Sequence, residues 1–592
     1  MAIILLFFFD KIKPISKTVF SILAIFIFVG FVWIVPSWNT SLMVSGIFRE
    51  FSLNPPATYA DFKKHYSDRE ILFYKEGIGA NVGVTRIKDE LGSKILIING
   101  KPDASSTLDM NTQVLLGQIP MMLHPNPKNI FVVGFGSGVT LGSVLTHEIN
   151  KVTCAEISPE VIEAGYLFKT ENGNCLADKR LNVVVEDALT YLKLAKNKYD
   201  VIISEPSNPW IAGIGNLFSK EYFERCKTKL NDDGLMVQWF HTYELSDDIM
   251  KLILHTFKAV FPYAQLWNPQ QGDIIMVGSK KPITLNVEQL EEKLQFDKVK
   301  KNFHKIKIEN VFTFLSCEAF SDEGFYSISG NLTINSELHP RLEFEAPKAF
   351  YLNQISTLTS RNDERFRTTT NHLLIRNYLQ THEPTIAELT SALAFHYNES
   401  NNYRLSYGIA KLLSEKNPAD YTTSITLINS EEKLGMNKLR LTELEKLYRQ
   451  FPDSPSVVQN YAYDKITEAV YAVSFLKNYP IDDYAKEILR TTKKDSVSQI
   501  KAFANLANLY LENSQPQQAY EMAERVSNLL DGNKNLGKLI ALDDFCYTYS
   551  ASSAYTLHYR TAIEYLMGLT MVNRQHSKKE MLGRMIEWRM KN

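Results

Sequence analysis

The sequence has few cysteines and no excess of charge of either sign, and each shortage excludes a class of protein. Its 5 cysteines lie far apart and form no CxxC pair. A disulfide framework or a cysteine zinc site is therefore not expected, and isolated buried thiols are. Lysine and arginine total 65 and aspartate and glutamate total 66, so the net charge is close to zero. The sequence therefore gives no indication of nucleic-acid binding.

Long apolar runs are confined to the N-terminus. The segment from Val19 to Val35 carries no charge, and Trp33 and Trp38 lie where an interfacial aromatic belt would be. About 17 to 25 apolar residues cross a bilayer, so this segment predicts a transmembrane helix. A cleaved signal peptide fits less well, because no small-residue cleavage site follows. The shorter run from Ala2 to Phe9 resembles the remnant of another membrane helix.

Two arguments give opposite membrane orientations. Lys11, Lys13 and Lys17 precede the predicted span, and the positive-inside rule would place the rest of the chain outside. A domain that uses a metabolic nucleotide cofactor needs the cytoplasm. We expect a membrane-anchored protein whose catalytic domain is cytoplasmic, because the positive-inside argument against this orientation rests on only a few charges.

Composition and periodicity divide the chain of 592 residues into several parts, too many for one hydrophobic core. Short alternating strands predict a small β domain. Buried strands alternating with helices then predict an α/β domain with a doubly wound parallel sheet. The predicted parts are a transmembrane segment (1–36), a connector (37–69), a small β domain (70–127), a catalytic α/β domain (128–345) and an all-α region (346–592).

The all-α region shows signs of an internal repeat. The spacing from Leu393 to Leu427 equals that from Pro418 to Pro452. A period of about 34 residues with these residue types is typical of tetratricopeptide repeats, which bind protein partners. A plain helical bundle is the alternative.

A glycine-rich loop and two acids predict a nucleoside site. Gly134, Gly136 and Gly138 lie between a predicted strand and helix, where glycine lets the backbone approach a ligand closely. Glu156 ends the next strand and is placed to hold both ribose hydroxyls, and Asp187 ends the third strand near an adenine amino group. The loop lacks the GxGxxG spacing, so a mononucleoside cofactor is favoured over NAD.

Glu205 is the candidate catalytic residue. It ends the fourth predicted strand and begins the run Glu205-Pro206-Ser207-Asn208-Pro209-Trp210. A carboxylate there points into the crevice beside the cofactor's reactive carbon, where it can either accept a proton from an attacking amine or hold that amine's charge. Aromatic residues from Gln238 to Glu244, among them Tyr243, are expected to follow the fifth strand. They either line an amine pocket or pack under the sheet.

These segments closely resemble the spermidine/spermine synthase (aminopropyltransferase) family. The resemblance is carried by NPKNIFVVGFGSG, VTCAEISPEVIEAG, VVVEDALTYL, YDVIISEPSNPW and NLFSKEYFERCK. The stretch NSELHPRLEFEAP from Asn335 is similar to the closing segment of bacterial membrane-fused spermidine-synthase-like proteins. The resemblance implies transfer of an aminopropyl group from decarboxylated S-adenosylmethionine to an amine, without a metal, in polyamine biosynthesis.

The family's cofactor residues carry over better than its substrate residues. The resemblance assigns cofactor binding to Gly134, Gly136, Ser137, Gly138, Glu156, Asp187 and Gln113. Ser137 stands where the family has an aspartate, and the family's catalytic aspartate is replaced by Glu205. Its second, diamine-binding aspartate is replaced by Asn208. Substrate binding is assigned to Asp103, Asp109, Asn208 and Tyr243, with Asp103 restoring part of the lost negative charge.

Two alternatives remain open at this point. Ser137 and the Asn208-Pro209-Trp210 run are reminiscent of methyltransferases that use S-adenosylmethionine itself. Loss of the paired aspartates would also suit a non-catalytic nucleoside-binding domain on a repeat scaffold. Fold alone does not choose among these functions.

Overall fold

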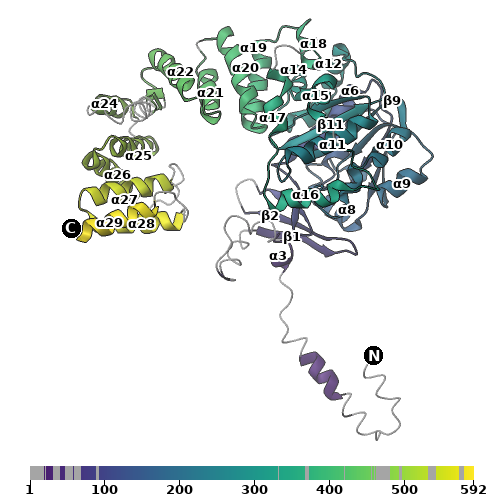
Figure 1. Cartoon of the computed structure of the whole chain (residues 1–592), viewed down its shortest axis with the longest axis horizontal. Helices are drawn as coiled ribbons and strands as arrows, with labels where there is room; N and C mark the ends of the chain where they lie inside the picture. The colour runs from purple at the N-terminus through teal and green to yellow at the C-terminus, as the bar shows by residue number, and fades with distance from the viewer. Residues whose placement is uncertain are drawn as a thin grey trace. The chain divides into compact units, whose positions relative to one another are not determined.

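The structure is a computed structural model of the 592-residue chain (Figure 1). The residues that it describes are 19, 22–30, 40–46, 58, 60, 69–88, 92–330, 333–366, 372–418, 420–454, 457–458, 460–461, 464, 481–492, 496–530, 542–572 and 579–591. The chain forms two compact units, Met1–Glu383 and Pro384–Asn592.

An eight-stranded sheet forms the centre of the first unit, in the order β12-β10-β11-β9-β8-β5-β6-β7. Its strands are β5 (Asn129–Val133), β6 (Lys151–Glu156), β7 (Leu181–Val185), β8 (Tyr199–Ser204), β9 (Leu230–His241), β10 (Tyr263–Trp267), β11 (Asp273–Ser279) and β12 (Glu318–Phe320). The chain passes from β5 outward to β7 and then returns to β8 on the other side of β5. The ligand crevice of such a sheet lies at this reversal, beyond the carboxyl ends of the strands.

The predicted α/β fold is confirmed, but the prediction of a parallel sheet is wrong for one edge. Strands β7, β6, β5, β8 and β9 are parallel, whereas β11 is antiparallel to β9 and to β10, and β12 is antiparallel to β10. The apolar runs of β10 and β11 showed two buried strands without showing their direction. The short turn between them, 268–272, permits only an antiparallel pair, since a parallel pair needs a long crossover.

Helices cover both faces of this sheet. On one face, α9 (Ala188–Leu194), α10 (Lys220–Lys229), α11 (Asp247–Val260) and α15 (Asp322–Ser329) share a hydrophobic cluster with the strands. On the other, α6 (Met110–Leu123) packs against β8, β9 and β11, and also contacts α7 (Val139–Val144) and α12 (Val287–Gln295). The other α-helices described in this unit are α3 (Thr40–Met43), α8 (Pro159–Gly165), α13 (Asp297–His304), α14 (Val311–Leu315), α16 (Arg341–Tyr351), α17 (Leu358–Asn362) and α18 (Leu374–Leu379).

A separate four-stranded antiparallel sheet precedes the main sheet, in the order β1-β2-β3-β4. Its strands are β1 (Arg69–Glu76), β2 (Asn81–Ile87), β3 (Lys94–Ile98) and β4 (Lys101–Ser105), as the alternating pattern predicted. Helix α6 falls within the predicted β domain, 70–127, yet it packs on the main sheet. The reason is its composition, because nearly all of its side chains are buried and need contacts along their whole length.

The first unit extends past residue 345, where the sequence prediction ended the catalytic domain. Leu342, Ala346 and Leu358 belong to the hydrophobic cluster under the main sheet. Glu364 then accepts hydrogen bonds from the backbone and hydroxyl of Ser321. These contacts join 341–366 to the α/β unit, because a helix whose apolar side packs into a core folds with that core.

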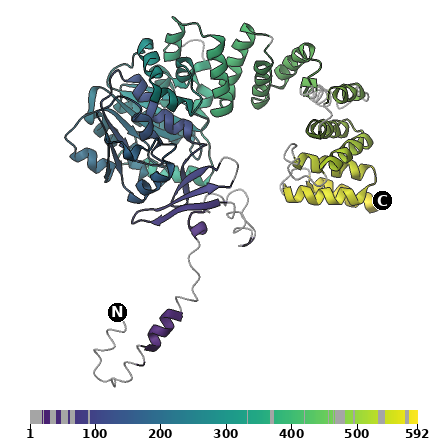
Figure 2. The same cartoon turned by 180° about the vertical axis from the view of Figure 1, so that it is seen from behind.

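In its described residues the second unit contains helices and no strands, and most helices that follow one another along the chain pack together (Figure 2). Its helices are α19 (Ile386–Ala394), α20 (Tyr403–Lys416), α21 (Tyr421–Lys433), α22 (Asn437–Gln450), α24 (Ile481–Thr491), α25 (Ser496–Glu512), α26 (Pro516–Leu530), α27 (Leu542–Tyr555), α28 (Tyr559–Val572) and α29 (Lys579–Lys591). The α-helical class is confirmed, while the tetratricopeptide assignment stays a prediction.

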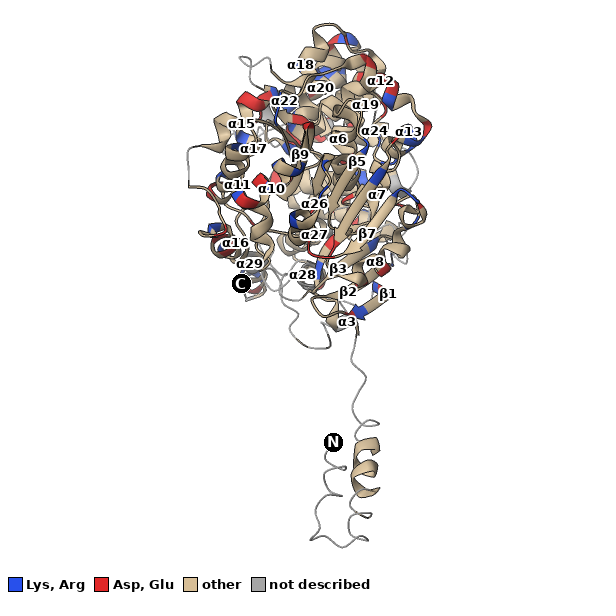
Figure 3. Ribbon diagram, turned by 90° about the vertical axis from the view of Figure 1, so that its right-hand side faces the viewer, with Lys and Arg blue, Asp and Glu red and all other residues tan. Residues whose placement is uncertain are grey.

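Part of the predicted transmembrane segment is described. Residues 22–30 are helical and uncharged, and Phe26, Ile27 and Phe28 are 72%, 64% and 66% exposed (Figure 3). Residues 20, 21 and 31–35, and the expected features at Ala2–Phe9, Trp33 and Trp38, lie outside the described residues. No helix among the described residues has the length and apolar character needed to cross a bilayer.

Candidate functional site

The glycine loop follows β5 at the centre of the main sheet. Gly134 has φ +88°, and a Cβ atom there would lie 2.9 Å from the carbonyl oxygen of Glu205. Gly136 has φ +53°, and no atom lies within 4 Å of where its Cβ would be. The first glycine is thus required by close packing, and the second leaves open space beside the loop. Such a loop at a helix N-terminus fits a nucleoside ligand.

Glu156 is the last residue of β6 and is buried. One of its carboxylate oxygens accepts a hydrogen bond from the backbone N–H of Phe135 at 2.9 Å, and the other accepts from Ser158 N–H at 2.8 Å. Burial raises the pKa of Glu156, while these backbone bonds oppose the rise. The two bonds hold the carboxylate against the glycine loop and leave lone pairs for hydroxyl donors, so Glu156 fits the predicted ribose-binding role.

Asp187 follows β7 and caps helix α9, accepting a hydrogen bond from the backbone N–H of Thr190 at 2.7 Å. The capping bond gives this acid a structural role that the sequence prediction did not assign to it. Contact with adenine stays a prediction.

Ser137 and Gln113 lie against each other beneath the loop. The Ser137 hydroxyl donates a short hydrogen bond to the Gln113 side-chain carbonyl, and Gln113 Nε2 donates to the carbonyl of Ser105 at 3.0 Å. Both side chains are buried. This pair connects the glycine loop to α6, a helix from the predicted β domain.

Glu205 follows β8 next to the loop, and its Oε2 accepts a hydrogen bond from the Thr140 hydroxyl at 2.7 Å. Burial raises the pKa of this carboxyl to about 7, against the lowering effect of the Thr140 bond. Three neighbouring acids, Asp109, Asp273 and Asp103, contribute smaller increases to that same value. A carboxyl with a pKa near neutrality is suited to exchange a proton with a substrate.

Asp273 belongs to this group of acids, although the sequence analysis did not identify it. It is buried at the start of β11 and accepts hydrogen bonds from Thr112 at 2.6 Å, Gln270 at 2.8 Å and Trp239 at 3.3 Å. Burial raises its pKa to about 6. Burial also raises the pKa of Asp109. The available signal was an aspartate directly before the apolar run IIMV, since a strand buried on both faces seldom begins with an acid.

Lys101 changes the role expected for Asp103. Its ammonium lies 2.5 Å from Asp103 Oδ1, which also accepts from the Ser207 hydroxyl at 2.6 Å. The Lys101 side chain is 5% exposed. Asp103 was expected to restore negative charge for a cationic diamine, but the buried lysine compensates that charge. Asp103 Oδ2 is also buried and has no hydrogen-bond partner among the described residues.

Asn208 and Tyr243 lie on the segments after β8 and β9. Asn208 is buried, and its Nδ2 has no hydrogen-bond partner among the described residues. Tyr243 stacks on His241, with ring centroids 4.2 Å apart. The expectation that Gln238–Glu244 follows the fifth strand is wrong for 238–241, which continue β9 because they pair with β11 from Asp273 to Met276.

The cysteine and acidic side chains form no metal-binding cluster in the described part of the chain. All five cysteines are buried, and none of them forms a disulfide. No group of three or more His, Cys, Asp or Glu side chains there is arranged to hold a metal ion.

Comparison with known proteins agrees with the family resemblance of the sequence. The family model for the spermine/spermidine synthase domain matches residues 110–270. The polyamine aminopropyltransferase of Caldicellulosiruptor saccharolyticus is 30% identical over 175 residues, 29% of this chain and 63% of that protein. That of Bacillus mycoides is 27% identical over 213 residues, 34% of this chain and 77% of that protein.

The chain thus spans less than two thirds of the Caldicellulosiruptor protein, and most of its own length lies outside the match. The crystal structure of spermidine synthase from Thermotoga maritima aligns with a TM-score of 0.34 and 22% identity, covering 46% of this chain and 87% of that one. The family match coincides with α6, the glycine loop, Glu156, Asp187 and Glu205. This chain therefore carries a spermine/spermidine synthase domain.

Proposed function

We propose that the chain transfers an aminopropyl group from decarboxylated S-adenosylmethionine to an amine. The observation that carries the proposal is Glu205, a carboxyl with a pKa of about 7 directly beside the glycine loop. The relatives that match this domain are named polyamine aminopropyltransferases, which supports the same chemistry.

The nucleoside part of the co-substrate is assigned to the ends of the first three strands. Glu156 holds the ribose hydroxyls, Asp187 lies toward the adenine, and the loop around Gly136 leaves room for the nucleoside. The co-substrate supplies a sulfonium that activates the aminopropyl carbon next to it. The protein's residues have the tasks of holding this carbon and the amine in line and of excluding water.

Glu205 receives the proton of the reaction. The amine nitrogen forms a bond to the aminopropyl carbon, and the carbon–sulfur bond breaks with its electron pair remaining on sulfur, which releases methylthioadenosine. The proton that the amine loses passes to the Glu205 carboxylate. Because Thr140 donates to one oxygen of this carboxylate, the other oxygen is the one left for the amine.

The charge of the site favours a cationic amine over a neutral one. Asp109 and Asp273 raise the pKa of Glu205, and Asp109 raises that of Asp273, so an ammonium group among these three acids stabilises their ionised forms. The Lys101–Asp103 pair contributes little net charge. We expect binding of a protonated amine to release protons from the acids to the buffer.

Methyl transfer from S-adenosylmethionine is the second candidate. It is favoured by Ser137, which donates to Gln113 and supplies no charge for an aminopropyl ammonium. The two reactions leave different products, methylthioadenosine for aminopropyl transfer and S-adenosylhomocysteine for methyl transfer.

The test is Glu205→Gln, assayed by mass spectrometry of the nucleoside product with each co-substrate and a panel of amines. We expect the wild type to release methylthioadenosine, and the variant to lose about 10²-fold or more in turnover with methylthioadenosine affinity nearly unchanged. Glu148→Gln is the control, because Glu148 is an exposed acid outside the site. S-adenosylhomocysteine as the only product, or a Glu205→Gln variant as fast as wild type, would overturn the proposal.

A further inference from the structure

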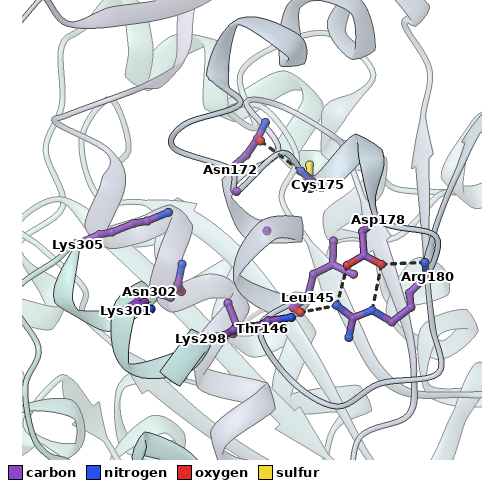
Figure 4. A pocket seen from close by; sticks show the side chains of 12 residues that line it. Leu145, Thr146, Asn172, Cys175, Asp178, Arg180, Lys298, Lys301, Asn302 and Lys305 are labelled. Atoms are coloured by element: carbon purple, nitrogen blue, oxygen red, sulfur yellow. Dashed lines mark hydrogen bonds and ion pairs between the residues drawn. The ribbon is translucent and has the colours of Figure 1, made fainter. Parts of the chain in front are cut away.

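The first unit contains a pocket that is lined by residues other than those of the candidate site. It has a volume of about 270 Å³. It is lined by Gly142, Leu145 and Thr146 on and after α7, by the segment from Asn172 to Arg180, and by residues of α13 and its end (Figure 4). Neither Gly134, Glu156, Asp187 nor Glu205 lines it.

The lining is strongly basic. It contains Lys298, Lys301, Lys305 and Arg180 against a single acid, Asp178, so four positive charges and one negative charge leave a net charge of +3. The whole chain has a net charge of −1, which makes this a local concentration of positive charge. Lysines alone on a surface are usually solvated, but here they surround a concave space.

Three of these cations share one side of a single helix. Positions 298, 301 and 305 are spaced by three and four residues along α13 and its C-terminal end, and this spacing places them on one face. Lys300 belongs to the same helix but does not line the pocket. The helix therefore presents a row of ammonium groups toward the pocket wall formed by α7.

On the opposite wall, Arg180 holds Asp178, the one acid in the lining, in a fixed position. Arg180 forms a two-point ion pair with Asp178, with distances of 2.7 and 3.0 Å, and donates further hydrogen bonds to the carbonyls of His147 and Leu145. The Arg180 bond lowers the pKa of Asp178, with a smaller contribution from Lys298. Asp178 is thus committed to Arg180 and leaves most of the lysine charge uncompensated.

Lys305 lies at the C-terminal end of the row, and its ammonium group has a fixed partner. Its ammonium donates to the backbone carbonyl of Glu171 at 2.8 Å, and burial lowers its pKa. An anion in the pocket would favour the charged form of this lysine. The lining also includes Leu145, which is apolar, and Gly142.

We propose that this pocket binds a small phosphorylated metabolite, with its phosphate oxygens on Lys298, Lys301 and Lys305 and its compact uncharged part against Leu145 and Gly142. The volume suits a small molecule and not a polymer. A tetrahedral polyanion satisfies three ammonium groups at once, which a monocarboxylate cannot. The proposal does not depend on the aminopropyltransferase function.

The pocket and the nucleoside site are connected through Asn172 and through helix α7. Asn172 lines the pocket, and its Nδ2 donates to the carbonyl of Ser137 in the glycine loop at 2.9 Å. Helix α7 borders both places, with the loop at its N-terminal end and Leu145 just beyond its C-terminal end. The two ligands are therefore expected to bind together, not in competition.

The experiment is calorimetric titration of the full chain with inorganic pyrophosphate at millimolar concentrations and moderate salt, alone and with saturating methylthioadenosine. We expect saturable binding in both conditions. Lys301→Ala and Lys298→Ala should each weaken it about 5- to 10-fold, as expected for loss of one charge-assisted contact. Lys300→Ala is the matched control and should change the affinity less than 2-fold, roughly the scatter of a solvated lysine.

Each other outcome overturns the proposal. Absence of saturable binding by the wild type would show that the basic lining holds no phosphate. Equal weakening by Lys300→Ala and Lys301→Ala would show diffuse attraction to a charged surface. Displacement of pyrophosphate by methylthioadenosine would place the anion in the nucleoside site. All four lysine positions are exposed or at a helix end, and melting temperatures will verify that the variants fold.

Discussion

Replacing Thr140 by valine tests whether the Glu205 carboxyl is tuned by its neighbour. The Thr140 hydroxyl is 2.7 Å from Glu205 Oε2 and 3.0 Å from the Gln113 carbonyl, so its one hydrogen is divided between two acceptors. Valine keeps the shape of the side chain and removes the donor. The hydrogen bond favours the ionised carboxylate, and without it the pKa of Glu205 must rise above about 7.

The size of the shift follows from the strength of such a bond. A hydrogen bond to a charged group contributes about 1.5–3 kcal/mol, and one pKa unit corresponds to about 1.36 kcal/mol. Full loss would raise the pKa by about 1 to 2 units. Because the hydrogen is shared with Gln113, we expect the lower end, about 1 unit, which would place the pKa of Glu205 near about 8.

The assay is the pH dependence of kcat/KM for methylthioadenosine release, which reports the free enzyme. The base acts when ionised, so the rate falls on the acid side of its pKa. We expect the acid limb of Thr140→Val to move up by about 1 unit with the high-pH plateau retained, which lowers the rate at neutral pH about 5-fold. Thr170→Val, an exposed control, should leave the profile unchanged.

Two results would refute this reasoning. An acid limb that stays in place in Thr140→Val, while Glu205→Gln removes it, would mean that the hydroxyl donates to Gln113 instead of Glu205. An acid limb that persists in Glu205→Gln would mean that another group, such as Asp273, is the one whose ionisation controls the rate.

Two further predictions concern the nucleoside site and the N-terminus. Glu156→Ala should weaken methylthioadenosine binding about 10²-fold or more in calorimetry, because it removes hydrogen bonds to a charged group worth about 1.5–3 kcal/mol each; an unchanged affinity in a folded variant contradicts the ribose role. The full chain should sediment with membranes and resist carbonate extraction, whereas a chain starting at Thr58 should not, because the uncharged Val19–Val35 run would be absent. Carbonate release of the full chain would contradict a spanning helix, and a reporter fused after Asn592 would establish the orientation.

The residues that follow individual strands were predictable from the sequence. Gly134, Glu156 and Glu205 each come directly after a short apolar run, and the alternation of such runs with helices determines that their carboxyl ends meet at one edge of a sheet. This inference needs only local periodicity and the rule for connecting parallel strands, so it was available before any contact was known.

Pairings between distant segments were decided by the tertiary structure alone. Lys101 and Asp103 lie on β4, yet the hydroxyl that joins them belongs to Ser207 after β8. Asp273 on β11 comes close to Glu205 and Asp109 only because β11 inserts antiparallel beside β9. No periodicity in the chain encodes such contacts.

The lysine pocket also combines a feature that the sequence shows with one that only the tertiary structure shows. The spacing of Lys298, Lys301 and Lys305 is a local property and places them on one helix face from sequence alone. That this face borders α7 and the Asp178–Arg180 pair depends on how separate elements pack. Burial and mutual repulsion, which raise the pKa of Glu205, exist only after that packing, so the sequence determined which side chains the site has and the tertiary structure determined their charge.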